Sequence, residues 1–119
     1  MRNAEALRNT AAALREILAV VADPIALHGM WIVRDVTIGA LSYVELVATF
    51  FDDFEADRLS DDQWREGGLS AAQIAAMRRF ASVFEAFVDA HGTELGEAAV
   101  LARPDWPTVT EAARGFIRA

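Results

Sequence analysis

The sequence contains neither cysteine nor lysine. Without cysteine the chain cannot form disulfides, bind a metal through thiolates or use a cysteine nucleophile. Its stability must therefore come from packing. A chain of 119 residues with 54% hydrophobic content can fill one core. We predict a single helical domain over residues 1–119.

Long hydrophobic runs are also missing. The longest unbroken apolar stretch, Ile17–Ala22, is far shorter than the ~20 residues of a membrane span. The first residues include Glu5 and no apolar run, so they do not read as a signal peptide. We therefore expect a cytoplasmic protein that does not bind membranes.

Imidazoles and reactive hydroxyls are scarce. His28 and His91 are the only histidines, and neither follows a glutamate by three residues, as the ligands of carboxylate dimetal bundles do. Three of the four serines, Ser42, Ser60 and Ser70, stand where they would cap helices. No nucleophile, base and orienting group can be assembled. We predict a protein that is not an enzyme and holds no metal and no cofactor.

Acidic residues exceed basic ones, and the excess is local. The net charge is −7, and residues 52–66, the acidic segment, carry seven acids against two arginines. A field of this sign repels nucleic acid and attracts basic partners. The segment lacks the spacing of an EF-hand calcium loop. Its acids are Asp52, Asp53, Glu55, Asp57, Asp61, Asp62 and Glu66.

Trp64 lies within the acidic segment, between the polar residues Gln63 and Arg65. An aromatic side chain inside a charged rim is typical of interface hot spots. The leading hypothesis is that the seven acids form a docking surface for a basic protein partner, with Trp64 as the anchor. Two plainer interpretations stay open: the segment is a loop kept soluble by its charge, and Trp64 fills the core beneath it.

Apolar residues recur at three- and four-residue spacing along most of the chain, which predicts amphipathic helices. Asn3 and three Ser-x-x-Glu/Gln motifs supply helix starts, and Pro24 and Gly92 supply stops. We predict an all-α single-domain bundle of four to five helices. The expected helices cover about 3–22, 42–56 and 70–91 and continue from about 105, with shorter ones near 61–66 and 94–102.

Residues 24–41 are harder to interpret. Residues 30–33 and 36–38 have the composition of strands, but no second strand is evident to pair with them. An unpaired strand leaves its backbone groups without partners. We therefore expect a short helix or a buried extended connector, with a short extended segment around 30–38.

Two stretches resemble an uncharacterised family of small actinobacterial all-helical proteins. The first is Asp23-Pro24, six residues and Trp31, followed by Phe51-Asp52-Asp53; the second is the Ala-x-Leu-Ala-x-Pro-x-Trp-Pro run of residues 99–107. The chain departs from the family after Trp31, where Ile32–Leu41 is more apolar. The family has no assigned activity, so the resemblance implies a fold only.

The Phe-Asp-Asp region also loosely resembles the small acidic helical immunity proteins of contact-dependent inhibition systems. Such proteins neutralise toxins, many of which are basic nucleases. An acidic surface accelerates the association with a basic toxin by steering. The resemblance implies an immunity or antitoxin role as the most concrete form of the docking hypothesis.

Two further interpretations belong to other classes of protein. One is a helical domain that binds a small molecule or a metal in a pocket among Trp31, Phe50, Phe54, Phe80 and Phe84. The other is a homodimer joined through the apolar stripe of the first helix, which consists of Leu7, Leu14, Leu18 and Val21.

Overall fold

The computed structural model describes residues 3–119, and all regular structure in this range is helical. The all-α prediction is confirmed, but the described residues form seven α-helices and two π-helical segments instead of four to five helices. The α-helices are α1 (Ala4–Val21), α2 (Pro24–His28), α3 (Tyr43–Ala48), α4 (Asp61–Glu66), α5 (Ala71–His91), α6 (Glu97–Leu101) and α7 (Trp106–Arg118). The π-helical segments are η1 (Gly29–Val33) and η2 (Thr49–Asp53).

Side-chain caps fix where the main helices begin. Oδ1 of Asn3 accepts a hydrogen bond of 2.8 Å from the amide of Ala6 at the start of α1. Capping boxes start α3, α4 and α5, with Ser42, Ser60 and Ser70 as the capping residues. In each box the serine side chain accepts a hydrogen bond from the amide of a Glu or Gln three residues later, and the side chain of that residue accepts one from the amide of the serine. The predicted helix starts are confirmed.

The Asp23-Pro24 pair ends α1, as predicted, but it also starts a further helix. Oδ1 of Asp23 accepts hydrogen bonds from the amides of Ile25 and Ala26, and Pro24 occupies the first turn of α2. The chain bends by 89° between α1 and the α2–η1 pair. This bend explains why the helix count exceeds the prediction.

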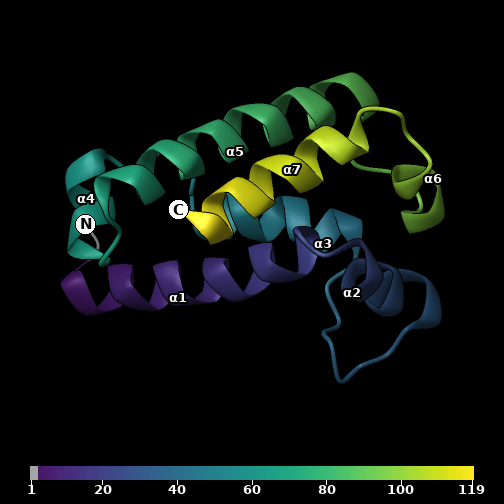
Figure 1. Cartoon of the computed structure of the whole chain (residues 1–119), viewed down its shortest axis with the longest axis horizontal. Helices are drawn as coiled ribbons and strands as arrows, with labels where there is room; N and C mark the ends of the chain where they lie inside the picture. Colours follow the sequence, from purple (N-terminus) through teal and green to yellow (C-terminus); the bar gives the residue numbers. More distant parts are fainter. Residues whose placement is uncertain (1–2) are drawn as a thin grey trace.

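The long helices pack around one core (Figure 1). In this arrangement α7 packs against both α5 and α1, and α4 packs against α1 and α5. Leu7, Leu14, Leu18 and Val21 of α1 are each at most 1% exposed. They point into the core, so the prediction of a homodimer seam along this stripe is wrong.

Aromatic rings fill the centre of the core. The ring centroids of Phe50, Phe80 and Phe84 lie 5.3–5.7 Å apart, and all three side chains are 0% exposed. Trp31 packs against Trp106 at 5.6 Å. Four of the five residues expected to line a small-molecule pocket, Trp31, Phe50, Phe80 and Phe84, are therefore buried among other aromatic rings. Binding of a small molecule among them stays a prediction.

Tyr43 ties the aromatic core to the end of α5. Its ring is 0% exposed and makes edge contacts with Trp31, Phe87 and Trp106. Its hydroxyl donates a 2.9 Å hydrogen bond to the carbonyl oxygen of Gly92. Burial disfavours the phenolate and raises the pKa of Tyr43 to about 12.

Because Tyr43 is the only tyrosine, an ultraviolet titration reports on it alone. We expect the folded protein to titrate near pH 12 and the denatured chain near the ordinary value of about 10. Since the raised pKa belongs to the folded state, the contribution of Tyr43 to stability is complete below pH 10 and is lost as the pH rises towards 12. A native midpoint near 10 contradicts the burial.

Residues 29–41 form a lobe that protrudes from the bundle beyond α1 and α2 (Figure 1); we call it the apolar lobe. The extended segment expected around 30–38 is absent, because residues 29–33 are π-helical and residues 36–38 form a turn. The segment is also not buried: Val33 is 67% and Val36 78% exposed. The residues whose composition is typical of strands are therefore exposed on the surface and do not form a buried connector.

Close contacts at two glycines hold the lobe together. A Cβ atom on Gly29 would lie 2.6 Å from Cδ1 of Ile38, and one on Gly39 would lie 2.9 Å from Sδ of Met30. Nε1 of Trp31 donates a 2.8 Å hydrogen bond to the carbonyl oxygen of Leu41, which anchors the lobe to the core. The lobe therefore has a defined shape of its own.

Candidate functional site

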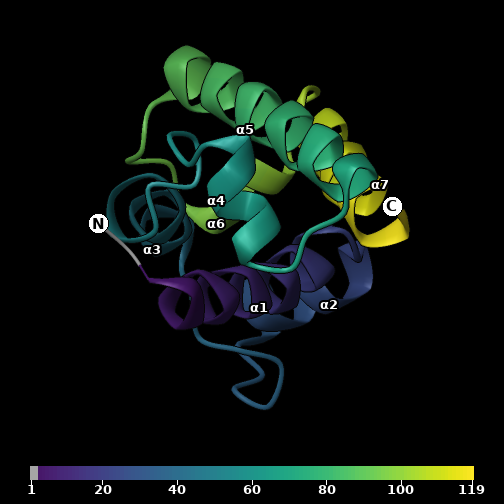
Figure 2. The ribbon, with the colours of Figure 1, turned by 90° about the vertical axis from the view of Figure 1, so that its left-hand side faces the viewer.

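The acidic segment covers one end of the bundle. It comprises the end of η2, the turns of residues 54–60 and α4, and it faces the viewer in Figure 2. In Figure 1 α4 lies at the end of the molecule at which α1 begins. We call this end, with the rest of the acidic segment that leads to it, the acidic end.

Most of these carboxylates face water. Asp57 is half-buried, and the other six acids of the segment are exposed. Negative charge in exposed positions at one end creates the directional potential that steers basic partners. The exposed acids are Asp52, Asp53, Glu55, Asp61, Asp62 and Glu66.

Trp64 does not belong to this surface. Its side chain is 1% exposed and belongs to the main hydrophobic cluster. It lies on the face of α4 that points inward, and Gly67, which follows it, comes so close to α1 that a Cβ atom would lie 2.9 Å from the backbone oxygen of Leu7. The role of Trp64 as a surface anchor is therefore wrong, and the interpretation that it fills the core beneath its segment is the one that the structure fits.

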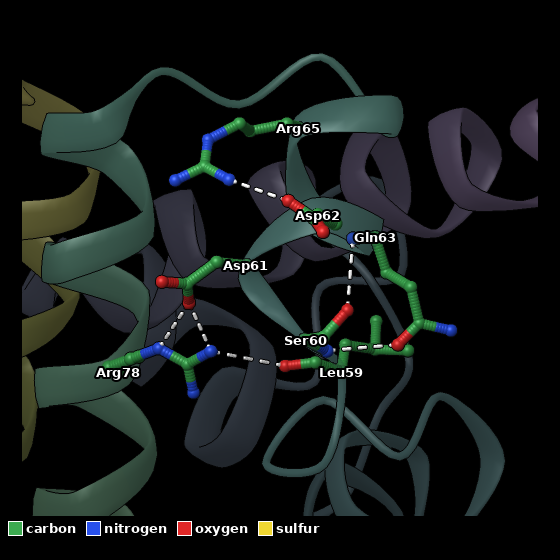
Figure 3. A network of polar contacts seen from close by, with 7 residues as sticks. All are labelled: Leu59, Ser60, Asp61, Asp62, Gln63, Arg65 and Arg78. Atoms are coloured by element: carbon green, nitrogen blue, oxygen red, sulfur yellow. Dashed lines mark hydrogen bonds and ion pairs between the residues drawn. The ribbon is translucent and has the colours of Figure 1, made fainter.

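Arginines neutralise part of the charge (Figure 3). Asp61 points towards α5 and pairs with the guanidinium of Arg78, which also donates to the carbonyl oxygen of Leu59. Asp62 pairs with Arg65 at 2.8 Å. Glu55 lies 3.5 Å from Arg58. These contacts are exposed, and pairs of this kind contribute little to stability.

The position of Asp61 and Asp62 has a second, purely structural explanation. Both lie in the first turn of α4, where the positive end of the helix dipole stabilises carboxylates. The capping box of Ser60 and Gln63 closes the same turn, as Figure 3 shows. Two of the seven acids thus contribute to the fold of the segment in addition to its charge.

Asp57 has an unusual environment. Its Oδ1 atom is buried and has no hydrogen-bond partner among residues 3–119. A hollow of about 190 Å³ lies beside it, lined by Ala56, Asp57, Arg78, Ala81, Ser82 and Glu85. A buried carboxylate oxygen without a donor is rare in folded proteins, and it favours the approach of a donor from outside the chain.

His91 pairs with an aspartate at the start of the next long helix. Nε2 of His91 lies 2.8 and 2.9 Å from the two carboxylate oxygens of Asp105, so the pair joins the end of α5 to the start of α7. Within residues 3–119 no group of three or more His, Asp and Glu side chains is placed to hold a metal ion. His91 therefore acts in the packing of helices.

A hollow of about 460 Å³ lies between α2 and α7. Leu27, Trp106 and Pro107 contribute apolar surface to it, and His28 and Arg114 contribute polar groups. Arg114 is already engaged, because it bonds to Glu111 and to the carbonyl oxygen of Ala22. The polar groups thus indicate no particular class of ligand.

The sequence interpretation missed the apolar lobe. Among residues 3–119 the large hydrophobic side chains that are most exposed all fall between positions 25 and 44: Ile25, Ile32, Val33, Val36 and Val44. The sequence does contain a feature that marks the lobe: Ile32–Leu41 is more apolar than the same stretch in the family that the chain resembles. It was interpreted as buried because strongly apolar segments usually are.

No protein-family model, curated protein or solved structure matches this chain. The resemblances to actinobacterial helical proteins and to immunity proteins therefore stay predictions. Among residues 3–119 no single helix is long and apolar enough to cross a membrane.

Proposed function

We propose that this protein is a non-catalytic domain that binds a basic protein partner through its acidic end. The observation that carries the proposal is that six of the seven carboxylates of residues 52–66 are exposed on elements that form one end of the bundle. A concentrated negative potential raises the rate at which a positive partner associates and orients its approach.

The environment of Asp57 supports a cationic ligand. A guanidinium or ammonium group that enters the adjacent hollow would supply the donor that its buried Oδ1 lacks. Glu85 lines the same hollow and would add a second negative charge, while Arg78, which also lines it, is already bonded to Asp61 and to the carbonyl oxygen of Leu59. A hydrogen bond between a buried carboxylate and a charged donor is stronger than one between neutral groups. An arginine or lysine side chain of the partner is therefore the group that fits.

The burial of Trp64 changes the expected character of the interface. Without an exposed aromatic anchor, the contact at this end depends on charge and hydrogen bonds, so its affinity should fall as salt increases. An immunity or antitoxin protein that neutralises a basic toxin is the most concrete form of this function. In that case a neighbouring gene encodes a secreted protein with a variable, basic C-terminal domain.

The test measures the binding of a labelled, arginine-rich peptide by fluorescence anisotropy at low salt. In one variant, Asp52→Asn, Asp62→Asn and Glu66→Gln remove three exposed charges from the acidic end. We expect its affinity to fall by at least about 10-fold, because each removed charge weakens attraction at the contact itself.

The control variant removes the same number of charges elsewhere, through Asp89→Asn, Glu94→Gln and Glu111→Gln. All three residues are exposed and lie outside the acidic segment, and Glu111 pairs with an arginine three residues away, as Asp62 does. Both variants change the net charge equally, so only the position differs. Equal loss of affinity in the two variants contradicts a localised binding surface.

A further inference from the structure

The apolar lobe presents hydrophobic side chains to water at its tip. Ile32, Val33 and Val36 are 42%, 67% and 78% exposed, and among the other large apolar residues that the structure describes only Ile25 and Val44 are exposed to this degree. Clustered exposed aliphatic side chains are unusual on a monomer and mark sites of association. Within the lobe, Ile38 packs close to Gly29 and Met30 packs close to Gly39, so these two side chains point into the lobe while the other three are exposed.

The charges at the tip are balanced and adjacent. Arg34 and Asp35 lie between Val33 and Val36, so the tip has one positive and one negative group and no net charge. Oδ1 of Asp35 accepts bonds from the amide and hydroxyl of Thr37, which fix the carboxylate at the turn and lower its pKa. A surface that fits this tip must be apolar and must offer an acid to Arg34 and a base to Asp35.

A hollow beside the lobe provides a matching shape. It has a volume of about 160 Å³ and is lined on its apolar side by Ile17, Val20, Met30 and Ile38. This volume is large enough for the side chain of one valine. The lobe carries protruding aliphatic groups, and the recess lies between the lobe and α1, with Glu16 also in its lining.

We propose that the apolar lobe is the contact between two copies of this chain. A two-fold interface places the same patch on both subunits, so that Arg34 of each copy faces Asp35 of the other while the exposed valines of one copy pack against the recess of the other. A second copy of the lobe thus offers an apolar surface, an acid for Arg34 and a base for Asp35. The inference is independent of the proposed function.

The distribution of charge permits this contact despite a net charge of −7 per chain. The lobe and the acidic end lie towards opposite ends of a molecule whose long axis is 37 Å (Figure 1). A contact made through the lobes therefore leaves the acidic end of each copy away from the interface, at a distance greater than the Debye length of about 8 Å. The acidic ends then remain open to partners.

The size of the lobe sets the strength of the dimer. Residues 29–41 supply fewer positions than the roughly 20–30 residues per side of a standard interface. We therefore expect a dissociation constant of about 1–100 μM and not an obligate dimer. Sedimentation equilibrium over roughly 1–500 μM protein should show the mass rise from 13.0 kDa towards twice that value.

Val36→Asp tests the surface itself. Val36 is 78% exposed, so the substitution leaves the core unchanged, while a dimer would place the new carboxylate of each copy against the apolar recess of the other. We expect the dissociation constant to rise by at least about 100-fold. The control, Ala86→Asp, adds the same charge at an exposed position of α5 and should leave the dimer intact.

Two results overturn the proposal. The first is a wild-type protein that stays monomeric up to the highest concentration, which would assign the lobe to another kind of partner or to a lipid surface. The second is a dimer that Val36→Asp and Ala86→Asp affect equally, which would place the interface elsewhere. Circular dichroism of each variant confirms that the helical fold is retained.

Discussion

Replacing Trp64 with alanine is expected to lower the free energy of unfolding by about 3–5 kcal/mol. The side chain is 1% exposed and fills the space between α4 and the rest of the core, so its removal leaves a large cavity. Total stabilities of domains are only about 5–15 kcal/mol, so the variant should be close to the limit of folding. Urea denaturation followed by circular dichroism gives the value.

The same variant separates the two interpretations of Trp64. A surface anchor would lose partner binding on truncation while the stability stayed near that of the wild type. Ile25→Ala serves as the control for removal of an aliphatic side chain at the surface, because Ile25 is 84% exposed, and its cost should be within about 0.5 kcal/mol. If Trp64→Ala lowers the free energy of unfolding as little as Ile25→Ala does, Trp64 is not part of the core.

Phe84→Ala is expected to cost a similar amount, about 3–5 kcal/mol, for a different reason. The ring of Phe84 is 0% exposed and lies 5.4–6.5 Å from four other aromatic rings. Its loss therefore removes the ring of α5 that joins η2 to α7. The rings that contact Phe84 are those of Phe50, Phe51, Phe80 and Trp106.

Phe84→Leu is the matched variant for this prediction. Leucine keeps most of the volume but has no ring, so we expect a loss of less than about 1.5 kcal/mol if packing volume decides stability at this position. Chemical denaturation of both variants gives the comparison. A loss of less than 1 kcal/mol for Phe84→Ala would show that the aromatic cluster is not the centre of the core.

The two surfaces considered for binding differ in kind and in place. The acidic end is highly charged and lacks an exposed aromatic residue, whereas the apolar lobe is hydrophobic and balanced in charge. Charge at an interface mainly governs the rate of association, while burial of apolar area governs how long a complex lasts. The salt dependence of each interaction therefore distinguishes them: peptide binding at the acidic end should weaken strongly with salt, and association through the lobe, which has only the Arg34–Asp35 pairs to screen, should weaken much less.

Several features of the fold could be predicted from the sequence because they depend only on residues close together in the chain. Ser42, Ser60 and Ser70 start helices through bonds to amides three residues away, and such bonds need no tertiary partner. The apolar stripe of α1 follows from the 3.6-residue period. In contrast, the extension of the second helix to about residue 56 was wrong, because η2 ends at Asp53 and a turn follows.

The position of the negative charge along the chain was set by the sequence, since seven acids fall within fifteen consecutive residues. The orientation of each side chain was not. Whether Trp64 faced outward or inward depended on the docking of α4 against α1, and Asp61 met Arg78 only because α4 and α5 pack together. A pattern in sequence cannot reveal such contacts between distant residues.

The sequence by itself determined an all-α chain, its caps, and an acidic stretch. Only the tertiary structure decided which apolar residues are covered: the stripe of α1 is buried by α7 and α4, while the equally hydrophobic Val33 and Val36 remain exposed. Hydrophobicity favours burial, but a residue is buried only where another element reaches it. The 89° bend after Pro24 carries the lobe away from the long helices, so no part of the described chain covers its tip.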